Sequence, residues 1–314
     1  MSPPVAEPAS SEDVLSLTLE QEGERLDKAL AAQLEDVSRS AIQRLIKEGA
    51  ITVNGQTSKA SYRVEAGDAI LVRLPQEEPQ EIIPQDIPLH IVYEDASLLA
   101  IDKPAGLVVH PAPGHRSGTL VNAVLAHAPE VAEVGPANRP GIVHRLDKET
   151  SGLILIAKDS ATHQALQQQF RRRQVSKTYL ALVEGNVQPP EGIIDAPIGR
   201  DPHHRQKMTV IHQGRRARSQ YKVIEIFPEQ TLLEVYPRTG RTHQVRVHLA
   251  WLGYPIVGDT IYGHRNQPLL ESRHFLHAAG IRFLHPATDE PMTLEAPLPA
   301  ELSTVLDQLR RRRR

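Results

Sequence analysis

The 314-residue sequence contains no cysteine, which excludes disulfide bonds, catalysis by a thiolate and zinc sites built from cysteine. It has no apolar run long enough to span a bilayer. The first residues are acidic and lack the apolar segment of a secretory signal peptide. The sequence therefore predicts a cytoplasmic protein without a membrane partner.

Motifs of several common enzyme classes are also absent. There is no Gly-x-Ser-x-Gly string typical of hydrolases and no glycine-rich loop for a dinucleotide or a nucleoside triphosphate. The 15 histidines include no His-Glu-x-x-His string. His203 and His204 are adjacent and would face opposite sides of a strand, and His243 and His248 would not share a helix face. Neither a metal nor a cofactor is expected.

The charges nearly balance, with a formal net charge of −2, but they are unevenly distributed. Residues 7–24 and 77–95 carry acidic residues without lysine or arginine. Positive charge gathers in three clusters, at residues 171–173, 215–218 and 310–314. Each cluster is either a solvated surface or a contact with nucleic acid, and the sequence alone leaves both interpretations open.

The most informative segment runs from Gly141 to Leu153. It places Arg145, Asp147 and Lys148 in a short polar loop, directly before the apolar run 153–157, which reads as a strand buried on both faces. A carboxylate fixed beside cations on a rigid strand can act as a nucleophile or a base. An isolated Arg-x-Asp would more often be a local ion pair, but this string is long and specific.

The segment resembles the signature of the RluA-type pseudouridine synthases, which isomerise uridine in RNA. It contains the family's His-Arg-Leu-Asp followed by Lys, an acidic residue, Thr, Ser, Gly and Leu. The resemblance implies that Asp147 is the catalytic residue. It also implies that Arg145 enters the RNA stack and helps to extrude the target nucleotide.

Two further segments extend this resemblance in the family's order. Residues 177–181 are similar to the second motif, in which Tyr179 would lie against the target base. Residues 239–246 are similar to the third motif, in which Arg241 would pair with the catalytic carboxylate. Together the motifs cover roughly residues 90–300, which makes chance a poor explanation.

The resemblance implies a reaction that breaks a glycosidic bond, turns the uracil and rejoins it through carbon, so no cofactor is required. Asp147 could attack a sugar carbon or remove a sugar proton to give a glycal, and the sequence does not decide between these routes. The layout is most similar to members that modify large-subunit (23S) ribosomal RNA. Alternatives are other ribosomal RNA sites, transfer RNA, or a noncatalytic RNA-binding factor in ribosome assembly. A monomer is expected.

Residues 17–75 predict a second, smaller unit. A helix opens at Arg25, and a second spans residues 38–49, with Ser38 as N-cap and Gly49 as C-cap. The strand 51–53 follows, with a hairpin turn at residues 54–55. The unit resembles S4-type RNA-binding domains, which implies that a basic helix face meets phosphates. The residues expected to contact RNA are Arg25, Arg39, Arg44 and Lys47, with Lys148 of the polar loop either contacting phosphate or staying solvated.

The predicted fold class is α+β, with a mixed, largely antiparallel sheet that carries a cleft, plus the small α+β S4-type domain. The expected boundaries are a disordered tail at 1–16, the S4-type domain at 17–75, a proline-rich acidic linker at 76–89, the catalytic domain at 90–303 and a basic tail at 304–314. In the large domain we expect strands at 98–101, 153–157, 179–183, 221–227 and 232–236, and helices at 120–125, 160–170 and 244–252.

Overall fold

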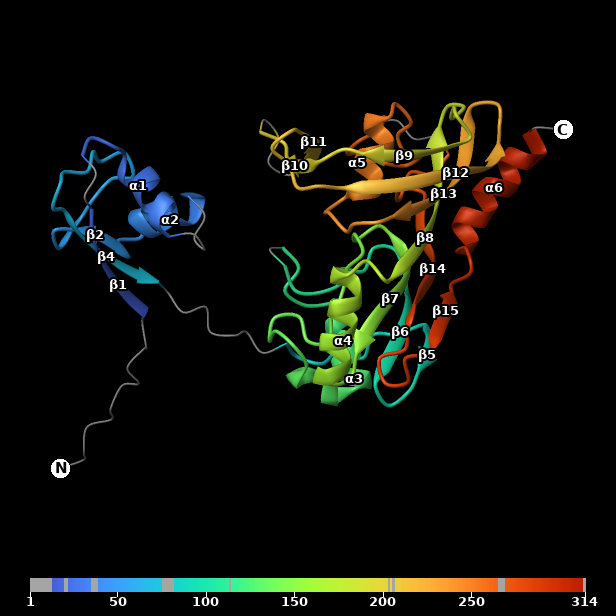
Figure 1. Cartoon of the computed structure of the whole chain (residues 1–314), viewed down its shortest axis with the longest axis horizontal. Helices are drawn as coiled ribbons and strands as arrows, with labels where there is room; N and C mark the ends of the chain where they lie inside the picture. Colours follow the sequence, from blue (N-terminus) through green and yellow to red (C-terminus); the bar gives the residue numbers. More distant parts are fainter. Residues whose placement is uncertain are drawn as a thin grey trace. The chain divides into compact units, whose positions relative to one another are not determined.

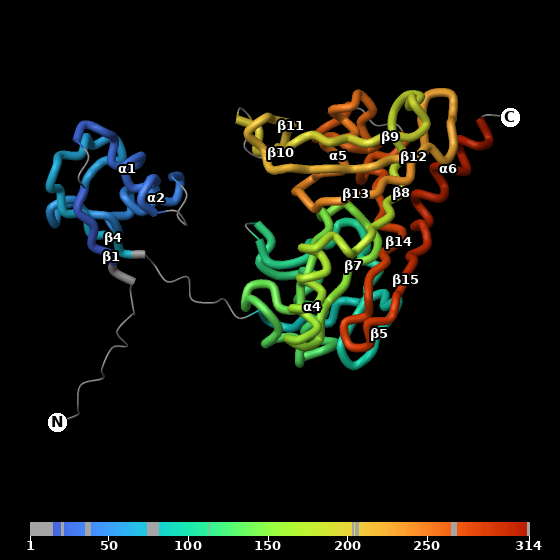
Figure 2. The backbone as a smooth tube through the Cα atoms, viewed as in Figure 1, coloured from blue at the N-terminus to red at the C-terminus, as the bar shows by residue number. Residues whose placement is uncertain are grey.

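The computed structural model describes residues 13–19, 22–34, 39–74, 82–112, 114–202, 204, 207–264 and 269–312. It divides into two compact units, Met1–Gln80 and Glu81–Arg314. Each unit is described by itself (Figures 1 and 2).

The small unit is an antiparallel sheet in the order β1-β4-β2-β3 with two helices. The apolar stripe of α2 is buried with Leu26 and Leu30 of α1, which closes a separate hydrophobic core. The left-handed Gly49 ends α2, and left-handed Asn54 and Gly55 make the hairpin turn that their sequence predicted. The elements are β1 Asp13–Thr18, α1 Leu26–Gln33, α2 Arg39–Lys47, β2 Ile51–Val53, β3 Gln56–Thr57 and β4 Ala69–Leu74.

The disordered tail expected at residues 1–16 extends too far toward the C-terminus. Strand β1 already begins at Asp13 and pairs along its whole length with β4, with Leu15 opposite Val72. Pairing with a neighbouring strand orders a segment whose composition alone gives no periodicity. Residues 1–12 of the predicted tail and Ser38, the predicted N-cap, lie outside the described residues.

The large unit is built on a nine-stranded sheet in the order β5-β6-β7-β14-β8-β13-β12-β9, with β15 paired to β14. The β7–β14 pair is parallel and the other pairs are antiparallel, which confirms the predicted mixed, largely antiparallel sheet. The strands are β5 Ile91–Glu94, β6 Leu98–Lys103, β7 Ser151–Ala157, β8 Ser176–Glu184, β9 Glu191–Asp195, β12 Arg218–Ile226, β13 Gln230–Pro237, β14 Leu276–Leu284 and β15 Pro291–Glu295, with β10 Ile198–Arg200 and β11 Met208–Val210 as a separate pair.

Helices cover both faces of this sheet, which explains the continuous apolar runs of β6 and β7. Leu99 of β6 packs into the core that includes α3, whereas its neighbour Leu98 packs into the core that includes Leu166 of α4. All seven residues of β7 are buried, which confirms the buried strand predicted at residues 153–157. The helical elements are α3 Leu120–His127, the short 3₁₀ helix η1 Pro129–Glu133, α4 Ser160–Arg171, α5 Gln244–Trp251 and α6 Ala300–Arg312.

Two expected boundaries of the large unit are wrong. Residues 82–89 were assigned to the linker, yet Ile82 and Leu89 pack against the main core, and the Gln85 backbone N–H donates to the Asn122 carbonyl at 2.9 Å. Residues 304–312 were assigned to a basic tail, yet they belong to α6, in which Leu306 and Leu309 are buried. A short amphipathic stripe hidden among arginines is enough to dock this helix.

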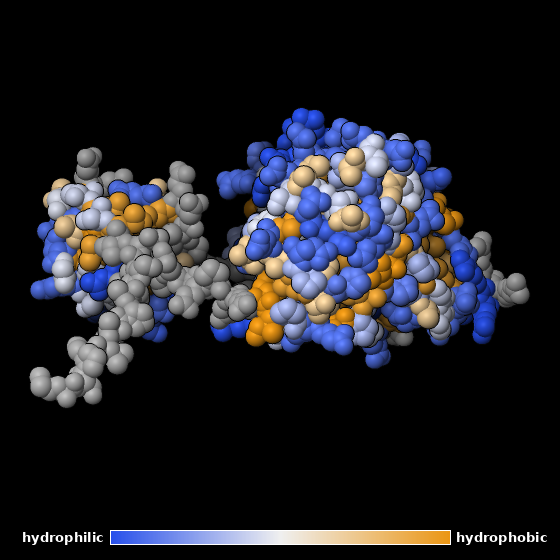
Figure 3. Space-filling model, turned by 90° about the horizontal axis from the view of Figure 1, so that it is seen from below, coloured by the Kyte–Doolittle hydropathy of each residue, from blue (hydrophilic) through white to orange (hydrophobic). Residues whose placement is uncertain are grey.

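No helix among the described residues is long and apolar enough to cross a membrane. Figure 3 shows hydrophilic residues predominating over the face of the large unit in view, with apolar residues in scattered patches. Single exposed apolar side chains such as Trp251, on α5, are ordinary features of a protein surface.

Candidate active site

Asp147 lies in the loop that leads directly into the buried strand β7, where backbone contacts fix its position. The Thr150 backbone N–H donates to the Asp147 carbonyl at 3.1 Å. The fully buried ammonium of Lys103 donates to the Lys148 carbonyl at 3.1 Å and to the carbonyls of Pro104 and Leu107. Burial lowers the pKa of Lys103 to about 7. The loop is thus tied to the end of β6, and the Asp147 side chain remains 18% exposed.

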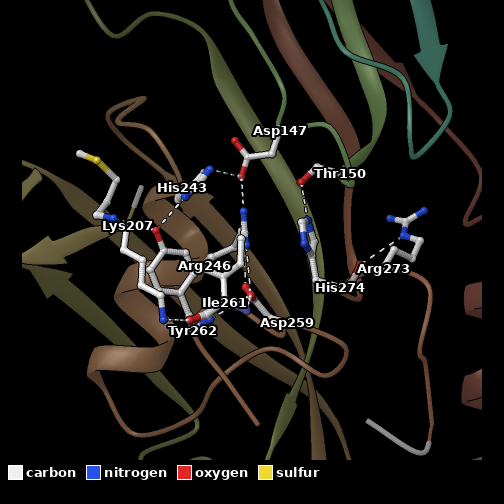
Figure 4. A network of polar contacts seen from close by, with 11 residues as sticks. Asp147, Thr150, Lys207, His243, Arg246, Asp259, Ile261, Tyr262, Arg273 and His274 are labelled. Atoms are coloured by element: carbon white, nitrogen blue, oxygen red, sulfur yellow. Dashed lines mark hydrogen bonds and ion pairs between the residues drawn. The ribbon is translucent and has the colours of Figure 1, made fainter. Parts of the chain in front are cut away.

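The ion pair to Asp147 comes from Arg246, near the start of α5. Arg246 Nη1 donates to Asp147 Oδ2 at 3.1 Å, while its Nε and Nη2 grip both oxygens of the buried Asp259 at 2.7 and 3.0 Å (Figure 4). The Arg246 guanidinium also lies 5.0 Å from the ring centre of Tyr262. Burial opposes its charge, but the bond and charge of Asp259 outweigh burial and raise the pKa of Arg246.

Asp259 in turn is held by the turn that follows it. Its Oδ1 accepts the backbone N–H groups of Ile261 and Tyr262 at 3.0 and 3.1 Å. The fork of Arg246 therefore cannot swing away from Asp147 without losing a second, fully buried pair. The arrangement presents one carboxylate in a fixed place beside a permanent positive charge.

The expected pairing of Asp147 with Arg241 is wrong. Arg241 Nε donates instead to the Arg216 carbonyl at 3.1 Å, and Asp147 pairs with Arg246, five residues further on. The reason lies at the junction into α5: Arg241 belongs to the loop before the helix, where Gln244 caps its backbone N–H at 3.0 Å. Arg246 lies within α5 on a buried side of the helix, 4% exposed.

His243 is a second neighbour of Asp147 that the sequence did not reveal. Its Nε2 lies 4.0 Å from Asp147 Oδ2, and its Nδ1 lies 2.7 Å from the Tyr262 hydroxyl. Its backbone is left-handed (φ 54°), which is uncommon for a residue other than glycine and marks a strained position beside the carboxylate. Burial lowers the pKa of His243, which favours the neutral ring near neutral pH.

Tyr179 and Asp147 line one cavity of about 670 Å³. Tyr179 lies on β8, next to β14 in the middle of the sheet, and is nearly buried. Burial, followed by the nearby Asp147 charge, raises the pKa of Tyr179, so its phenol stays protonated at neutral pH. Val245 and Leu276 are buried and also line this cavity. The cavity thus offers an aromatic ring and apolar walls beside a fixed carboxylate.

Residues 97–251 match the family model described as RNA pseudouridylate synthase, and residues 24–70 match the S4 domain. The chain is 49% identical, over 96% of its length and 95% of the relative's, to an uncharacterized RNA pseudouridine synthase of Chloroflexus aurantiacus. It is 45% identical, over 93% of each chain, to the ribosomal large subunit pseudouridine synthase D of Pseudomonas aeruginosa. The chain belongs to the RNA pseudouridine synthase family.

A solved structure supports the same assignment. The human RNA pseudouridylate synthase domain containing 4 matches with a TM-score of 0.56 and 29% identity, over 70% of this chain and 93% of that one. A pseudouridine synthase acts on a base that has left its stack. Arg145, which lines the cavity beside Asp147, is exposed to solvent.

His144 anchors this synthase loop from beneath. Its Nε2 accepts the Leu155 backbone N–H of β7 at 2.9 Å, and its ring packs on Phe170 of α4 at 4.9 Å between ring centres. Burial lowers the pKa of His144 to about 3, so the ring is neutral and acts as an acceptor. A second anchor joins Thr150 Oγ1 to His274 Nε2 at 2.8 Å (Figure 4).

Arg273 links these anchors to the C-terminal helix. It donates to Ser151 Oγ at 2.9 Å and to the Leu276 carbonyl at 2.8 Å, and it pairs with Glu301 of α6 at 3.2 Å. Ser151 is the first residue of β7 and lies four positions after Asp147. Helix α6 therefore contributes to the frame that holds the loop, a role that its basic composition did not indicate.

In the small unit, two of the arginines expected at RNA share one buried carboxylate. Asp27 is 0% exposed at its side chain and accepts from Arg25 Nε at 3.0 Å, from Arg39 Nη2 at 2.8 Å and from the Gln43 amide. Chiefly through the Arg25 bond, the pKa of Asp27 lies below its usual range. Arg25 and Arg39 are themselves 41% and 44% exposed, so the cluster fixes both cations at the surface.

The other two basic residues of this unit are less constrained. Arg44 Nε lies 3.9 Å from Glu48, with both side chains more than half exposed, so this pair adds little. Lys47 makes no ion pair within the described residues. The six expected RNA contacts, from these four residues and from Arg145 and Lys148, remain predictions.

The sequence motifs located the site, but they assigned the partner of Asp147 wrongly and did not reveal the roles of His243, Asp259 and Tyr262. Arg246 is the last residue of the third motif. Its place inside the helix predicted at 244–252 was the available signal that it, rather than Arg241, would be held in a fixed position. Asp259 and Tyr262 belong to no motif, and only the fold brings them to Arg246. Among the described residues, no group of three or more acidic or histidine side chains could hold a metal ion.

Proposed function

We propose that the protein isomerises specific uridines to pseudouridine in large-subunit ribosomal RNA, with Asp147 as the catalytic carboxylate. One observation carries this proposal: a partly exposed carboxylate, held at 3.1 Å by a buried arginine, lines the same cavity as Tyr179. The Pseudomonas aeruginosa relative, named for the large ribosomal subunit, supports the choice of RNA. Action on ribosomal RNA would place the enzyme in the cytoplasm.

The reaction needs one carboxylate and no electron carrier. The bond between N1 of uracil and C1′ of ribose breaks, and a bond between C5 and C1′ forms. C5 loses a proton and N1 gains one, so atoms and electrons balance within the nucleotide. Asp147 can start this by attack on C1′ or by removing the C2′ proton, and both routes need it ionised.

Each neighbour of Asp147 then has a role that its position allows. Arg246 keeps the carboxylate oriented and compensates its charge. Tyr179 stacks on the extruded uracil, a kind of contact typically worth about 1–3 kcal/mol. Arg145 is exposed at the mouth of the cavity and fills the space that the base leaves in the RNA stack.

Mapping of pseudouridine in ribosomal and transfer RNA incubated with the purified protein tests this proposal. Carbodiimide marking and primer extension should give new stops in large-subunit ribosomal RNA, as free RNA or in a ribosomal particle. Stops only in transfer RNA would contradict the substrate and keep the chemistry. Tight binding without stops on any RNA or particle would favour the noncatalytic assembly factor instead.

A further inference from the structure

The cavity around Asp147 is strongly cationic beyond the residues that the reaction uses. Asp147 is its only carboxylate among the described residues. Seven cations line it, drawn from three segments far apart in the sequence: Arg145, Arg171, Arg173, Lys177, Arg238, Arg241 and Arg246. Only Arg246 has a carboxylate partner within the described part of the chain. The other six line the cavity without an ion pair to any described carboxylate.

Lys177 lies on the same strand as Tyr179 and on the same face of β8. Side chains two residues apart on a strand are separated by about 6.8 Å. This separation is on the scale of the distance between the base and the phosphate of one nucleotide. Lys177 is half-buried and has no carboxylate partner among the described residues, and its Nζ lies 3.8 Å from where a Cβ on Gly240 would be. Burial lowers the pKa of Lys177 to about 8.

Arg173 reaches the same cavity from the end of α4. Its backbone is left-handed (φ 60°), a conformation that favours glycine at this position of a helix end. The end is closed by the Arg173 N–H donating to the Phe170 carbonyl at 3.2 Å and the Gln174 N–H donating to the Gln169 carbonyl at 2.9 Å. An arginine therefore occupies a strained position where glycine would serve the fold better, which points to a use for its side chain.

Arg241 approaches from the loop before α5. Its Nε is held by the Arg216 carbonyl, while its terminal nitrogens make no hydrogen bond within the described residues. Burial, followed by the nearby charges of Arg215 and Arg173, lowers the pKa of Arg241. A fork with free N–H groups beside other cations matches the geometry of a phosphate group.

We propose that Arg173, Lys177 and Arg241 form a subsite for one backbone phosphodiester of the RNA, next to the extruded uridine. This inference deepens the proposed function and rests on it for the identity of the nucleotide. The subsite fixes the sugar–phosphate while Tyr179 holds the base, so the sugar is presented to Asp147 from both ends. Arg241 is thereby reassigned from the carboxylate to the substrate.

Three variants and a matched control test the subsite by equilibrium binding in an Asp147→Asn background, so that no product forms. The variants are Lys177→Met, Arg241→Gln and Arg173→Gly, and the glycine suits the left-handed backbone. Each should weaken RNA binding roughly tenfold and reduce the slope of log K against log salt by about 0.7–0.9. Arg172→Ala removes one charge from the same helix end but not from the cavity lining, and should change affinity less than twofold.

A scan of the RNA backbone locates the phosphate. In a series of RNAs, one linkage at a time is replaced by a neutral methylphosphonate. Replacement of a single linkage beside the modified uridine should weaken binding to the Asp147→Asn protein about tenfold. With that RNA, adding any of the three subsite substitutions should cause no further loss of affinity. Equal losses from the variants at every linkage would overturn the subsite and indicate diffuse attraction.

The test of the phosphate subsite and the test of pseudouridine formation can fail independently of each other. Pseudouridine formation is measured with the wild-type chain on the unmodified RNA. Pseudouridine without a linkage-specific effect contradicts the subsite alone. A linkage-specific effect with no pseudouridine on any RNA contradicts the proposed function. Because Lys177→Met removes a poorly solvated charge, its melting temperature should not fall, so weaker binding cannot be attributed to unfolding.

Discussion

Two clusters of aspartate and arginine, one in each unit, are arranged in opposite senses. In the small unit Asp27 is fully buried and its arginines are more than 40% exposed. In the large unit the side chain of Arg246 is 5% exposed and that of Asp147 is 18% exposed. In each cluster the buried partner makes three or more hydrogen bonds, and the exposed partner faces solvent or a cavity. The first cluster thus presents cations at the surface, and the second presents a carboxylate to a cavity.

Burial decides which partner of an ion pair is fixed in place and which is exposed for contact with another molecule. Surface pairs add little stability, but a buried anchor with several partners fixes its exposed partner in one place. Asp259 holds Arg246 in place through two hydrogen bonds. At Asp27, the Gln43 amide adds a further hydrogen bond to those from the arginines. The two clusters therefore predict different failures when the anchor is changed.

The largest effect is expected at Arg246. Arg246→Ala leaves Asp259 buried without its partner and should cost about 3–5 kcal/mol in the free energy of unfolding, with loss of turnover. Arg246→Lys keeps the charge but cannot contact both carboxylates, and should retain more stability while turnover falls about 100-fold. Chemical denaturation and single-turnover kinetics measure both quantities. A fully active, stable alanine variant would contradict the anchoring role.

A smaller and local effect is expected at Asp27. Asp27→Asn removes the charge that fixes Arg25 and Arg39, and should destabilise α1 and α2 by about 1–3 kcal/mol. Because its folded pKa lies below the usual range, the stabilisation is present at neutral pH and lost as the pH falls below about 4.

Hydrogen exchange of the α1 and α2 amides in the Asp27→Asn variant measures this loss of stability and shows whether it is confined to the two helices. RNA affinity should fall while the single-turnover rate at saturating RNA stays within twofold, since the carboxylate of the large unit is untouched. A reduced rate at saturation would mean that the small unit takes part in the chemistry rather than in binding.

Lys177 has no carboxylate partner among the described residues, and its replacement should stabilise the protein, whereas the substitutions at Arg246 and Asp27 should destabilise it. Lys177→Met should raise the free energy of unfolding by about 1–3 kcal/mol at pH 7. Its folded pKa of about 8 lies below the unfolded value of about 10.4. Between these values the unfolded wild type binds a proton that the native state lacks, so wild-type stability rises with pH. The advantage of the variant should therefore shrink from about pH 8 to 10.5, and a pH-independent difference would contradict the account.

Much of this architecture could be read from the sequence, because local patterns encode it. The continuous apolar run of β7 requires cover on both faces, and Asn54-Gly55 permits the left-handed turn of a hairpin. The motif around Asp147 identified the loop that the fold places at the central strands. These features depend on neighbouring residues alone.

What the sequence could not give depends on distant parts of the chain. The choice between Arg241 and Arg246 is made by Asp259, which follows α5 and belongs to no pattern. The order of residues 82–89 comes from Asn122 and the core, and that of 304–312 from a few leucines among arginines. Arg25 and Arg39 were expected at RNA from the resemblance to S4-type domains, and only the fold reveals that both pair with the buried Asp27.

The most direct test of the central claim is the single-turnover rate of pseudouridine formation by Asp147→Asn at saturating RNA. Asparagine keeps the shape and a hydrogen-bond acceptor for Arg246 but cannot supply the negative charge. The account predicts a loss of about 10⁴-fold or more, with RNA affinity within threefold of the wild type. A rate within tenfold of the wild type would show that the carboxylate held by Arg246 is not the catalytic group.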